Sequence, residues 1–504
     1  MAQADDRITP THRRLDALRI DNRFARLGEA YFSRVMPTPL TNPRLLHANA
    51  DVAALLDLDP AAFDQAAFTQ VFAGNAPLPG AEPLAMLYAG HQFGVWVPQL
   101  GDGRAILLAQ VRNARGQSWD LQLKGAGRTP YSRFADGRAV LRSSVREYLA
   151  GEALHHLGIA TTRALCLIAA DDPVQRETLE RAAVICRVAP SHVRFGSFEV
   201  FYDRGQFERI RVLADHVIDE HFPDLSAAPD RHARWLERLV DRTAELIAAW
   251  QSVGFCHGVM NTDNMSAVGV TLDFGPYGFI DGFDAHHICN HSDEGGRYAY
   301  DNQPRIGHWN CARLVQALVP LLGEPAERAA EIGQAIVDRY PQTYTRAMTA
   351  RWRAKFGLNE VRDGDEALMN RFLTLLHRGR SDFTLSFRGL AKVRRDDDAV
   401  PAALADHILD LDALRAWLHD YRARLHAEAM ADDVRAAQMN RVNPQVVLRN
   451  HLAQRVIEDC ERGNTTELEQ LLAALRKPFD VPRRAEFAAV PPPDARHITV
   501  SCSS

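Results

Sequence analysis

Residues 257–275 read HGVMNTDNMSAVGVTLDFG, and this stretch decides how the rest of the chain is interpreted. It places a carboxylate beside an amide, Asp263 and Asn264, and adds a second carboxylate in Asp273-Phe-Gly. Oxygen ligands of this kind suit a magnesium ion that also binds the phosphates of a nucleotide. A solvated loop with an Asx turn is the alternative. The stretch therefore predicts a site for a metal ion and a nucleotide.

The order of these residues is that of a protein-kinase catalytic loop, His-Arg-Asp-x-x-x-x-Asn, followed by Asp-Phe-Gly. His257 and Asn264 keep the spacing of that loop. The position of the base, however, is Val259, and an apolar side chain cannot take a proton from a hydroxyl group. Asp263 is the only carboxylate in the loop and is the predicted replacement. We therefore expect nucleotide and metal binding without ordinary kinase chemistry.

Composition indicates a globular protein of ordinary charge. The chain has 504 residues, 46% of them hydrophobic and 24% charged, with a net charge of −5. Nothing in this balance favours nucleic-acid binding, and no apolar run approaches the ~18 residues that span a bilayer. Acidic residues near the N-terminus argue against a signal or transit peptide, and the seven cysteines form no C-x-x-C pair. We expect a cytoplasmic protein with no nucleic-acid or membrane partner; a monomer is compatible with the sequence, which does not fix the oligomeric state.

The pattern of apolar residues predicts strands first and helices afterwards. Strands are expected at Ala105–Val111, Ser118–Leu123, Thr161–Ile168 and Ala182–Val188. A helix from Val145 to Leu157, with Ser144 as its N-cap and Gly158 after its end, is expected between the second and third strands. Further helices are predicted at Asp230–Val253, Cys311–Leu322, Ala326–Arg346, Asp365–Leu376, Leu411–Met430 and Pro444–Ile457.

This order of elements is that of a kinase small lobe followed by a kinase large lobe. We predict an α+β, protein-kinase-like bilobal fold with a β-rich small lobe, a mainly helical large lobe and extensions at both ends. The predicted boundaries are an N-terminal extension at 1–90, the small lobe at 91–195, the large lobe at 196–480 and a C-terminal tail at 481–504. Prolines in the N-terminal extension favour a segment that wraps around the lobes.

Lys124 and Glu147 are the candidate ion pair of the small lobe. A lysine at the end of a strand can reach phosphates and pair with a carboxylate on the following helix. The segment Ser144-Val-Arg-Glu147 also fits a capping box, in which Glu147 would bind the backbone N–H of Ser144. The residues alone leave the two roles even. The downstream Asp273 motif favours the ion pair.

Two further groups of residues suit phosphates. Gly101-Asp-Gly103-Arg104 precedes the first predicted strand, where glycines let the backbone approach an anion. A plain hairpin turn is an equal alternative for this group. Arg187 and Arg194 could hold a terminal phosphate with two guanidinium groups, although surface arginines are equally common. In an ordinary kinase, charge in this region would be misplaced because the adenine pocket lies there.

The chain resembles the selenoprotein O family of pseudokinase-like protein adenylyltransferases over nearly its whole length. The resemblance is carried by long, ordered blocks: HQFG (91–94), GDGR (101–104), QLKGAGRTPYSRFADG (122–137), RSSVREY (142–148), HGVMNTDNM (257–265) and LDFGPYGF (272–279). It implies an enzyme with a kinase-like fold that binds ATP in reversed orientation, so that the α-phosphate meets the acceptor. The expected reaction transfers AMP, or UMP if UTP substitutes, to Ser, Thr or Tyr hydroxyls of proteins and releases pyrophosphate.

The resemblance also implies the role of each site residue. Asp263 is the implied proton acceptor, assisted by Lys124 and Glu147, and Asn264 and Asp273 are the implied ligands of Mg²⁺ or Mn²⁺. The implied nucleotide contacts are Gly101, Gly103, Arg104, Lys124, Asp136, Gly137, Arg187, Arg194 and Asp273. The alternatives are an ordinary kinase that transfers the γ-phosphate through Asp263, and an ATP-binding scaffold without activity.

Cys502 lies third from the end of the chain, in a Pro-rich tail. Many eukaryotic relatives carry selenocysteine at the corresponding place, so the resemblance implies redox chemistry there. Cys289, in the loop after Asp273, is the expected partner. The hypothesis is a reversible disulfide that changes access to the active site; a free, functionless thiol is the equal alternative.

Overall fold

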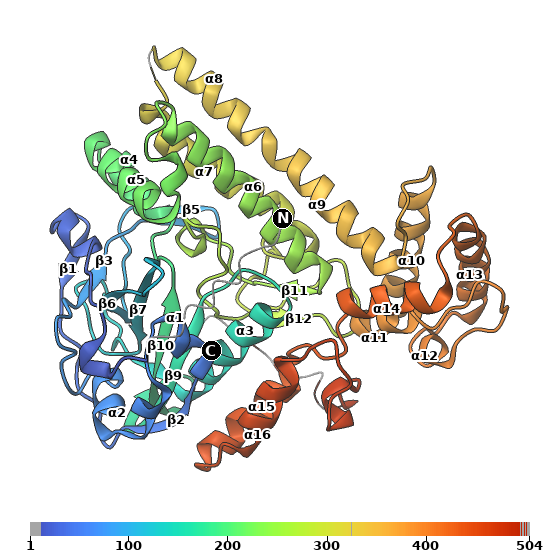
Figure 1. The fold of residues 1–504 in the computed structure, drawn as a ribbon, viewed down its shortest axis with the longest axis horizontal. Helices are drawn as coiled ribbons and strands as arrows, with labels where there is room; N and C mark the ends of the chain where they lie inside the picture. Colours follow the sequence, from blue (N-terminus) through green and yellow to red (C-terminus); the bar gives the residue numbers. More distant parts are fainter. Residues whose placement is uncertain (1–11, 324, 494, 496–497, 499, 501–504) are drawn as a thin grey trace, which may run out of the picture. The chain divides into compact units, whose positions relative to one another are not determined.

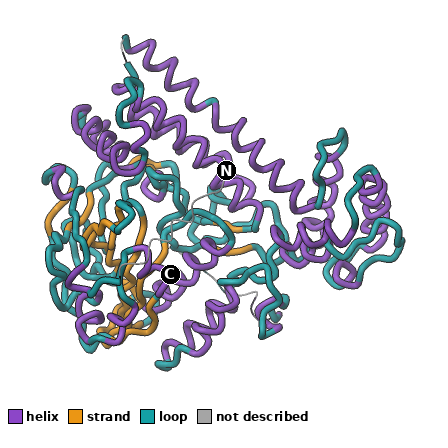
Figure 2. The backbone as a smooth tube through the Cα atoms, viewed as in Figure 1, coloured by secondary structure: helices purple, strands orange, loops and turns teal. Residues whose placement is uncertain are grey.

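The computed structural model describes residues 12–323, 325–493, 495, 498 and 500. The fold is α+β, as predicted: Figure 2 shows most strands gathered in one region and helices through much of the remainder. The chain forms two compact units. Unit 1 comprises Met1–Tyr148, Thr161–His232 and Ser266–Val268, and unit 2 comprises Leu149–Ala160, Ala233–Met265 and Gly269–Ser504. The kinase-like arrangement of two lobes stays a prediction.

Unit 1 is built on an eight-stranded sheet (Figure 1). Its order is β1-β3-β6-β7-β10-β9-β2, with β8 paired to β10, and every pair is antiparallel. The bounds are β1 Phe32–Arg34, β2 Arg44–Ala48, β3 Leu84–Met86, β6 Ala105–Arg112, β7 Ser118–Lys124, β8 Ala139–Val140, β9 Arg163–Gln175 and β10 Leu179–Ala189. The hairpin of β4 (Gly90–Gln92) and β5 (Val95–Val97) is separate. All four predicted strands are present, as β6, β7, β9 and β10.

The N-terminal segment completes this sheet. It adds β3 and then β1 beyond β6 and adds β2 beyond β9, so that β6 and β9 have partners on both sides. Helices α1 (Ala50–Leu55) and α2 (Ala66–Phe72) contribute apolar side chains to the same core as the strands, among them Val52, Phe68 and Phe72. Since these side chains are fully buried, the segment is part of the hydrophobic core and covers otherwise open strand edges.

Unit 1 runs past residue 195, where the sequence placed the end of the small lobe. Helices α4 (Gly196–Asp203) and α5 (Phe207–His221) belong to it. Their buried faces meet the N-terminal segment: the Phe201 ring lies 5.0 Å from that of Tyr31, and the Tyr31 hydroxyl donates to the Arg209 carbonyl at 3.0 Å. The apolar side chains of both helices have N-terminal residues as partners, and the predicted lobe boundary at 195 stays a prediction.

Helix α3 spans Leu141–His156 and begins four residues before the predicted start. Strand β8 immediately precedes α3. The pairing of Ala139 and Val140 with β10 fixes the chain there, and the helix begins at the next residue, Leu141. Ser144 therefore lies inside the helix, and its predicted role as N-cap is wrong. The predicted end is confirmed: Gly158 follows the helix with φ 77°, the left-handed conformation in which glycine commonly terminates helices.

Unit 2 is mainly helical. Its long helix α6 (Arg231–Ser252) matches the predicted helix and buries Trp235, Leu239, Leu246 and Trp250. The hairpin β11 (Phe255–Cys256) and β12 (Gly278–Phe279) follows. The other helices are α7 Gln303–Leu318, α8 Ala326–Val337, α9 Arg339–Phe356, α10 Asp365–Gly379, α11 Phe383–Leu390, α12 Ala402–Ala405, α13 Leu411–His426, α14 Asp432–Val442, α15 Asn450–Glu461 and α16 Thr466–Leu475.

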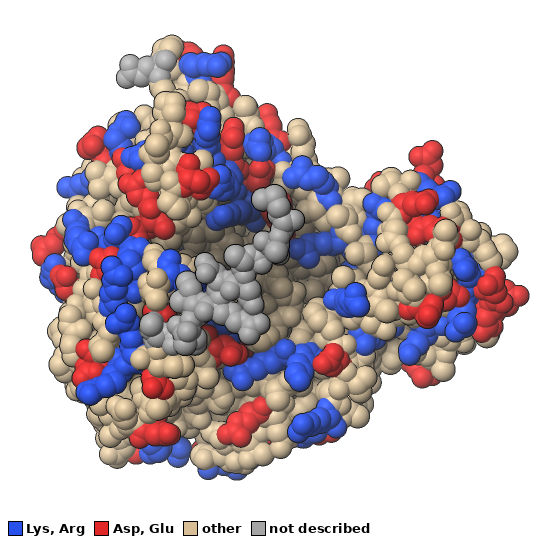
Figure 3. Space-filling model, in the orientation of Figure 1, with Lys and Arg blue, Asp and Glu red and all other residues tan. Residues whose placement is uncertain are grey.

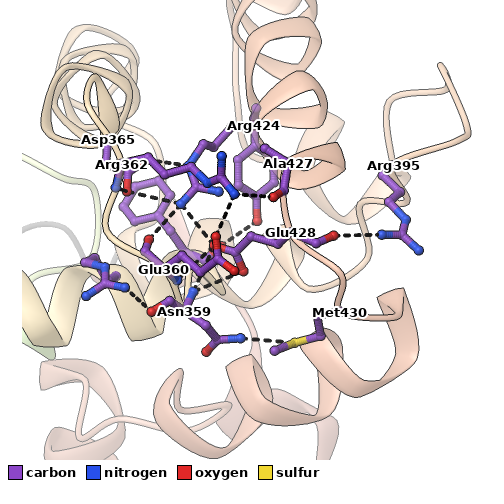
Figure 4. A network of polar contacts seen from close by, with 12 residues as sticks. Asn359, Glu360, Arg362, Asp365, Arg395, Arg424, Ala427, Glu428 and Met430 are labelled. Atoms are coloured by element: carbon purple, nitrogen blue, oxygen red, sulfur yellow. Dashed lines mark hydrogen bonds and ion pairs between the residues drawn. The ribbon is translucent and has the colours of Figure 1, made fainter.

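A buried ionic network, the Glu428 network, fixes the loop before α10 to the end of α13 (Figure 4). The Glu428 carboxylate accepts the backbone N–H groups of Asn359 and Glu360 at 3.0 and 3.1 Å, and Arg424 at 3.0 Å. Arg424 also binds Asp365 through two nitrogens. Each buried carboxylate is thus matched by donors from within unit 2.

Charged side chains of both signs are mixed over the surface in view in Figure 3. This distribution agrees with the small net charge of −5. Among the described residues, no helix is both long and apolar enough to cross a membrane.

Candidate functional site

Lys124, Glu147 and Arg187 form a buried cluster in unit 1. Lys124 ends β7, and its Nζ lies 2.5 Å from Oε2 of Glu147 on α3. Arg187 on β10 donates to the same carboxylate through Nε and, at 3.1 Å, through Nη2. All three side chains are at most 5% exposed. The structure therefore forms the predicted ion pair, and Glu147 does not act in a capping box.

The cluster continues through two polar side chains to Arg194. Arg187 Nη1 donates to Gln122 Oε1 at 3.0 Å, and Gln122 Nε2 donates to Asp102 Oδ2 at 3.2 Å. Asp102 Oδ1 lies 3.8 Å from Arg194 Nη2, and the Arg194 guanidinium lies 4.7 Å from the centroid of the Tyr88 ring. We call these six residues the cation network: Lys124, Glu147, Arg187, Gln122, Asp102 and Arg194.

The network gathers positive charge in the core of unit 1. It holds three cations and two carboxylates, and every member is buried. Burial alone would raise the pKa of Glu147, but the charges of Arg187 and Lys124 hold it below its ordinary value, so the carboxylate is ionised. Guanidinium and ammonium groups that lie together in this way form strong hydrogen bonds with anions. The network is therefore suited to bind phosphate oxygens.

Glycine turns lie next to the cation network. A Cβ on Gly101, at φ 145°, would stand 2.4 Å from the Tyr131 ring, and one on Gly137, at φ 72°, would stand 2.2 Å from the Gly127 carbonyl. Both positions therefore need glycine. Asp136, just before Gly137, is held by Arg176 at 2.8 and 3.0 Å, and this bond lowers the pKa of Asp136.

The loop of unit 2 that holds the predicted catalytic residues connects β11 to β12. Phe255 pairs with Phe279 and Cys256 with Gly278. Both ends of the loop 257–277 are therefore held together by this antiparallel pair of strands. The His257 Nε2–H donates to the Leu272 carbonyl at 3.0 Å, which ties the start of the loop to the residue before Asp273. Burial lowers the pKa of His257, so the imidazole stays neutral and positions the loop.

Asp263 and Asn264 share one 3₁₀ turn, Thr262–Asn264. The amide nitrogen of Asn264 donates to the Val259 carbonyl at 3.0 Å, which leaves its oxygen as a ligand for a cation. Asp263 is 6% exposed. Asp273 has φ 61°, a left-handed conformation that is strained for a non-glycine residue and common at functional sites.

An amide oxygen and a carboxylate are the donor set expected for magnesium bound together with phosphates. Asn264 and Asp273 supply this set from one loop, so the residues fit the implied metal ion. Among the described residues there is no group of three or more His, Cys, Asp or Glu able to hold a metal without further ligands. The fit is therefore to an ion that takes its remaining ligands from phosphates and water.

Three residues of this region were not singled out from the sequence. Gln122 and Asp102 connect the arginines of the cation network, and Arg176 holds Asp136. Arg187 stands opposite Gln122 in the β10–β7 pairing, so the strand register was the signal that could have found Gln122. The contact between Arg194 and Asp102 joins residues far apart in the chain and leaves no local pattern.

Comparisons with known proteins identify the family. The model of the family described as protein adenylyltransferase SelO matches residues 14–476. The chain belongs to this family. The predicted membership is thereby confirmed.

Curated relatives of the family match along almost their whole length. A protein nucleotidyltransferase YdiU of Methylococcus capsulatus is 54% identical over 483 residues, covering 95% of each chain. Those of Paraburkholderia xenovorans and Bordetella avium are each 51% identical, covering 96% and 97% of this chain and 95% and 99% of theirs. The prediction of an enzyme, a protein nucleotidyltransferase, is confirmed by the family and by these relatives.

Cys502 lies outside the described residues. Cys289 is half-buried, and its thiol donates to the carbonyls of Pro276 and Cys256 at 3.0 and 3.4 Å. The His291 N–H donates to the Val500 carbonyl at 2.9 Å, so a described residue of the tail contacts the loop that holds Cys289. The Cys289–Cys502 disulfide stays a prediction.

Proposed function

We propose that the protein transfers AMP from Mg²⁺-bound ATP to a Ser, Thr or Tyr hydroxyl of a protein substrate. The oxygen of the hydroxyl forms a bond to the α-phosphorus, the bond between the α-phosphorus and the bridging oxygen breaks, and pyrophosphate leaves. The observation that carries this proposal is the convergence of three buried cations, Lys124, Arg187 and Arg194, in the cation network, which suits the two outer phosphates. UTP is a second substrate under the same scheme, with UMP transferred.

The cation network favours the reversed orientation of the nucleotide. Lys124, Arg187 and Arg194 would bind the β- and γ-phosphates, where their charge stabilises pyrophosphate as it leaves. Gly101, Gly103 and Arg104 would contact the phosphates from the neighbouring turn, and Asp136 and Gly137 would lie toward the nucleoside. An uncharged purine would gain nothing from three buried cations, so the base is expected at the outer end.

Asn264 and Asp273 would hold the metal ion, which supplies charge neutralisation at the phosphates when bound. Asp263 would accept the proton of the attacking hydroxyl, because it is the carboxylate of the 3₁₀ turn that also carries Asn264. Glu147 keeps Lys124 and Arg187 in place and is a positioning residue.

The chain itself links the two sets of residues. Ser266 follows Asn264 by two residues and belongs to unit 1, where it pairs with Arg194, and Ala267 donates to the Val193 carbonyl at 2.9 Å. The segment that carries Asp263 and Asn264 is thus continuous with the segment beside Arg194. We infer that the chain has a kinase-like bilobal fold, in which such a segment connects the two lobes.

Labelled ATP tests the proposed reaction against its alternatives. With a mixture of acceptor proteins, label should reach protein from α-labelled ATP and not from γ-labelled ATP. Label from γ-labelled ATP alone would establish a kinase. Label from neither would establish a nucleotide-binding scaffold. Tryptic mapping of the α-labelled product should then place AMP on a hydroxyl residue.

We also infer that the tail regulates access to the site through Cys289 and Cys502. The contact between His291 and Val500 supports this proposal because it brings the tail to the loop after Asp273. Peptide mapping of oxidised, non-reduced protein should yield one crosslinked peptide with both cysteines. The proposal fails if no such peptide forms, or if Cys502→Ala leaves the response of activity to oxidant and reductant unchanged.

A further inference from the structure

Phe134 is a large apolar side chain held in water by an anchored loop. It is 92% exposed, the highest value among the exposed large hydrophobic side chains of the described residues. A single exposed apolar residue is common and indicates little by itself. The construction of the loop around Phe134 is the second observation, and it points toward a ligand.

One side of this loop is fastened to the glycine turn of the phosphate region. The Thr129 hydroxyl donates to the Asp102 carbonyl at 2.7 Å, and the Ser132 hydroxyl donates to the Gly103 carbonyl. The Ser132 hydroxyl also accepts the backbone N–H of Thr129 at 2.8 Å. These bonds fix the loop against Gly101–Arg104, which the proposed function assigns to the phosphates.

The other side of the loop is fastened at the proposed nucleoside end. Arg176 binds the Asp136 carboxylate through two nitrogens, and the Gly127 N–H donates to the Gly137 carbonyl at 3.2 Å. Phe134 therefore stands two residues from an anchor on either side, Ser132 and Asp136. Arg133, immediately before it, has φ 55°, a strained conformation for a non-glycine residue.

We propose that Phe134 is a stacking platform for the base of the nucleoside triphosphate. This inference rests on the proposed function, which places the outer phosphates at Lys124, Arg187 and Arg194 and the nucleoside at Asp136 and Gly137. A base that lies beside Asp136 is close in the chain to the ring of Phe134, which is exposed to solvent and can therefore stack on the base. Every base has a π-face, so such a platform accepts all bases, and a purine covers more of the ring than a pyrimidine. Phe134 thus favours ATP over UTP.

Fluorescence tests stacking without any transfer reaction. The probe is the 5′-triphosphate of 2-aminopurine riboside, whose fluorescence falls when its base stacks on an aromatic ring. We expect quenching with the wild-type protein, an about tenfold weaker affinity with Phe134→Ala, and wild-type behaviour with Phe134→Trp. Phe207→Ala is the matched control, because it removes the same side chain from a site that is 45% exposed and is not a proposed nucleotide contact.

Kinetics with two nucleotides test the consequence for specificity. Phe134→Ala should raise KM for ATP about tenfold and KM for UTP less, with kcat little changed, because the ring acts through the base alone. Inhibition by inorganic tripolyphosphate, which has no base, should stay as in the wild type. If Phe134 has only a structural role, the variant should lose affinity for ATP, UTP and tripolyphosphate to the same extent.

The outcomes separate this inference from the proposed function. The stacking role is wrong if Phe134→Ala binds the fluorescent probe with the affinity of the wild type. It is also wrong if inhibition by tripolyphosphate weakens as much as KM for ATP rises. Transfer of AMP is unaffected by either result. If quenching depends on Phe134 but no AMP reaches any protein, the stacking role stands and the proposed reaction fails. Absence of quenching with the wild-type protein overturns the stacking role.

Discussion

The cation network of unit 1 and the Glu428 network of unit 2 use the same kinds of side chain and differ in how their charges are matched. In the cation network, Lys124, Arg187 and Arg194 outnumber the carboxylates. In the Glu428 network, one buried arginine, Arg424, serves two carboxylates, and backbone N–H groups supply the remaining donors (Figure 4).

This difference shows that a buried ion pair does not by itself indicate a binding site. The carboxylates of the Glu428 network bind donors from within the network, so we expect no ligand there. The cation network gathers three cations beside glycines whose conformation no other residue tolerates well. The three cations and the adjacent glycines together, rather than burial, distinguish the proposed phosphate site.

The largest expected effect on the rate of transfer comes from a substitution outside both networks. Asp273→Ala should lower the rate of AMP transfer by at least about a thousandfold, because the phosphates lose the metal ion that neutralises their charge. The melting temperature should stay close to that of the wild type. Transfer at the wild-type rate in saturating magnesium would show that Asp273 does not hold the metal ion.

The Glu428 network should affect stability and not ligand binding. Glu428→Ala leaves two backbone N–H groups without their acceptor and removes one of the two carboxylates that bind Arg424, and we expect a loss of about 3 kcal/mol in the free energy of unfolding. Denaturation measures this loss, and calorimetric titration should give an unchanged affinity for ATP in the folded variant. A selective loss of ATP affinity would contradict the distinction between the two networks.

The arginines of the cation network should discriminate between nucleotides by their phosphates. Arg187→Ala or Arg194→Ala should weaken binding of ATP by roughly 10- to 100-fold, the effect of losing hydrogen bonds from a charged group, and should change binding of AMP little. Calorimetric titration of both nucleotides measures the ratio, with Glu428→Ala as the control. An equal loss for ATP and AMP would count against the reversed orientation.

The smallest effect tests whether Lys124 and Glu147 act together. Either single substitution to Ala should impair transfer, and the double variant should be at most about threefold worse than the poorer single variant, because residues that act as a unit are not additive. A double-mutant cycle of kcat/KM measures the coupling. Additive losses would mean that Glu147 supports the site independently of Lys124.

The candidate residues of the loop between β11 and β12 could be proposed from the sequence because their chemistry is contiguous. Asp263, Asn264 and Asp273 lie within one short stretch, so their spacing alone carries the signal. The cation network was predicted only in part. Its members meet through strand pairing and a helix, and the contact between Gln122 and Asp102 leaves no local pattern in the chain.

Helix boundaries show where tertiary structure overrides local patterns. The predicted helix Ala326–Arg346 is two helices, α8 and α9, which meet at Asp338. Pro341 stands in the first turn of α9, where a missing N–H group is tolerated, and it would have disrupted a continuous helix. This boundary was readable from the sequence. The start of α3 was not, because it depends on the pairing of β8 with β10.

The division of the chain between the units has a consequence for its synthesis on the ribosome. Unit 1 is not complete until Val268 has been made, past the midpoint of the 504-residue chain. Leu149–Ala160 emerges early but belongs to unit 2, whose remaining residues begin at Ala233. Domains commonly fold one after another during translation, from the N-terminus onward. Here a nascent chain that stops at His232 would hold the sheet and the cation network yet lack Ser266–Val268, so the segment that pairs beside Arg194 arrives only with the residues of the second unit.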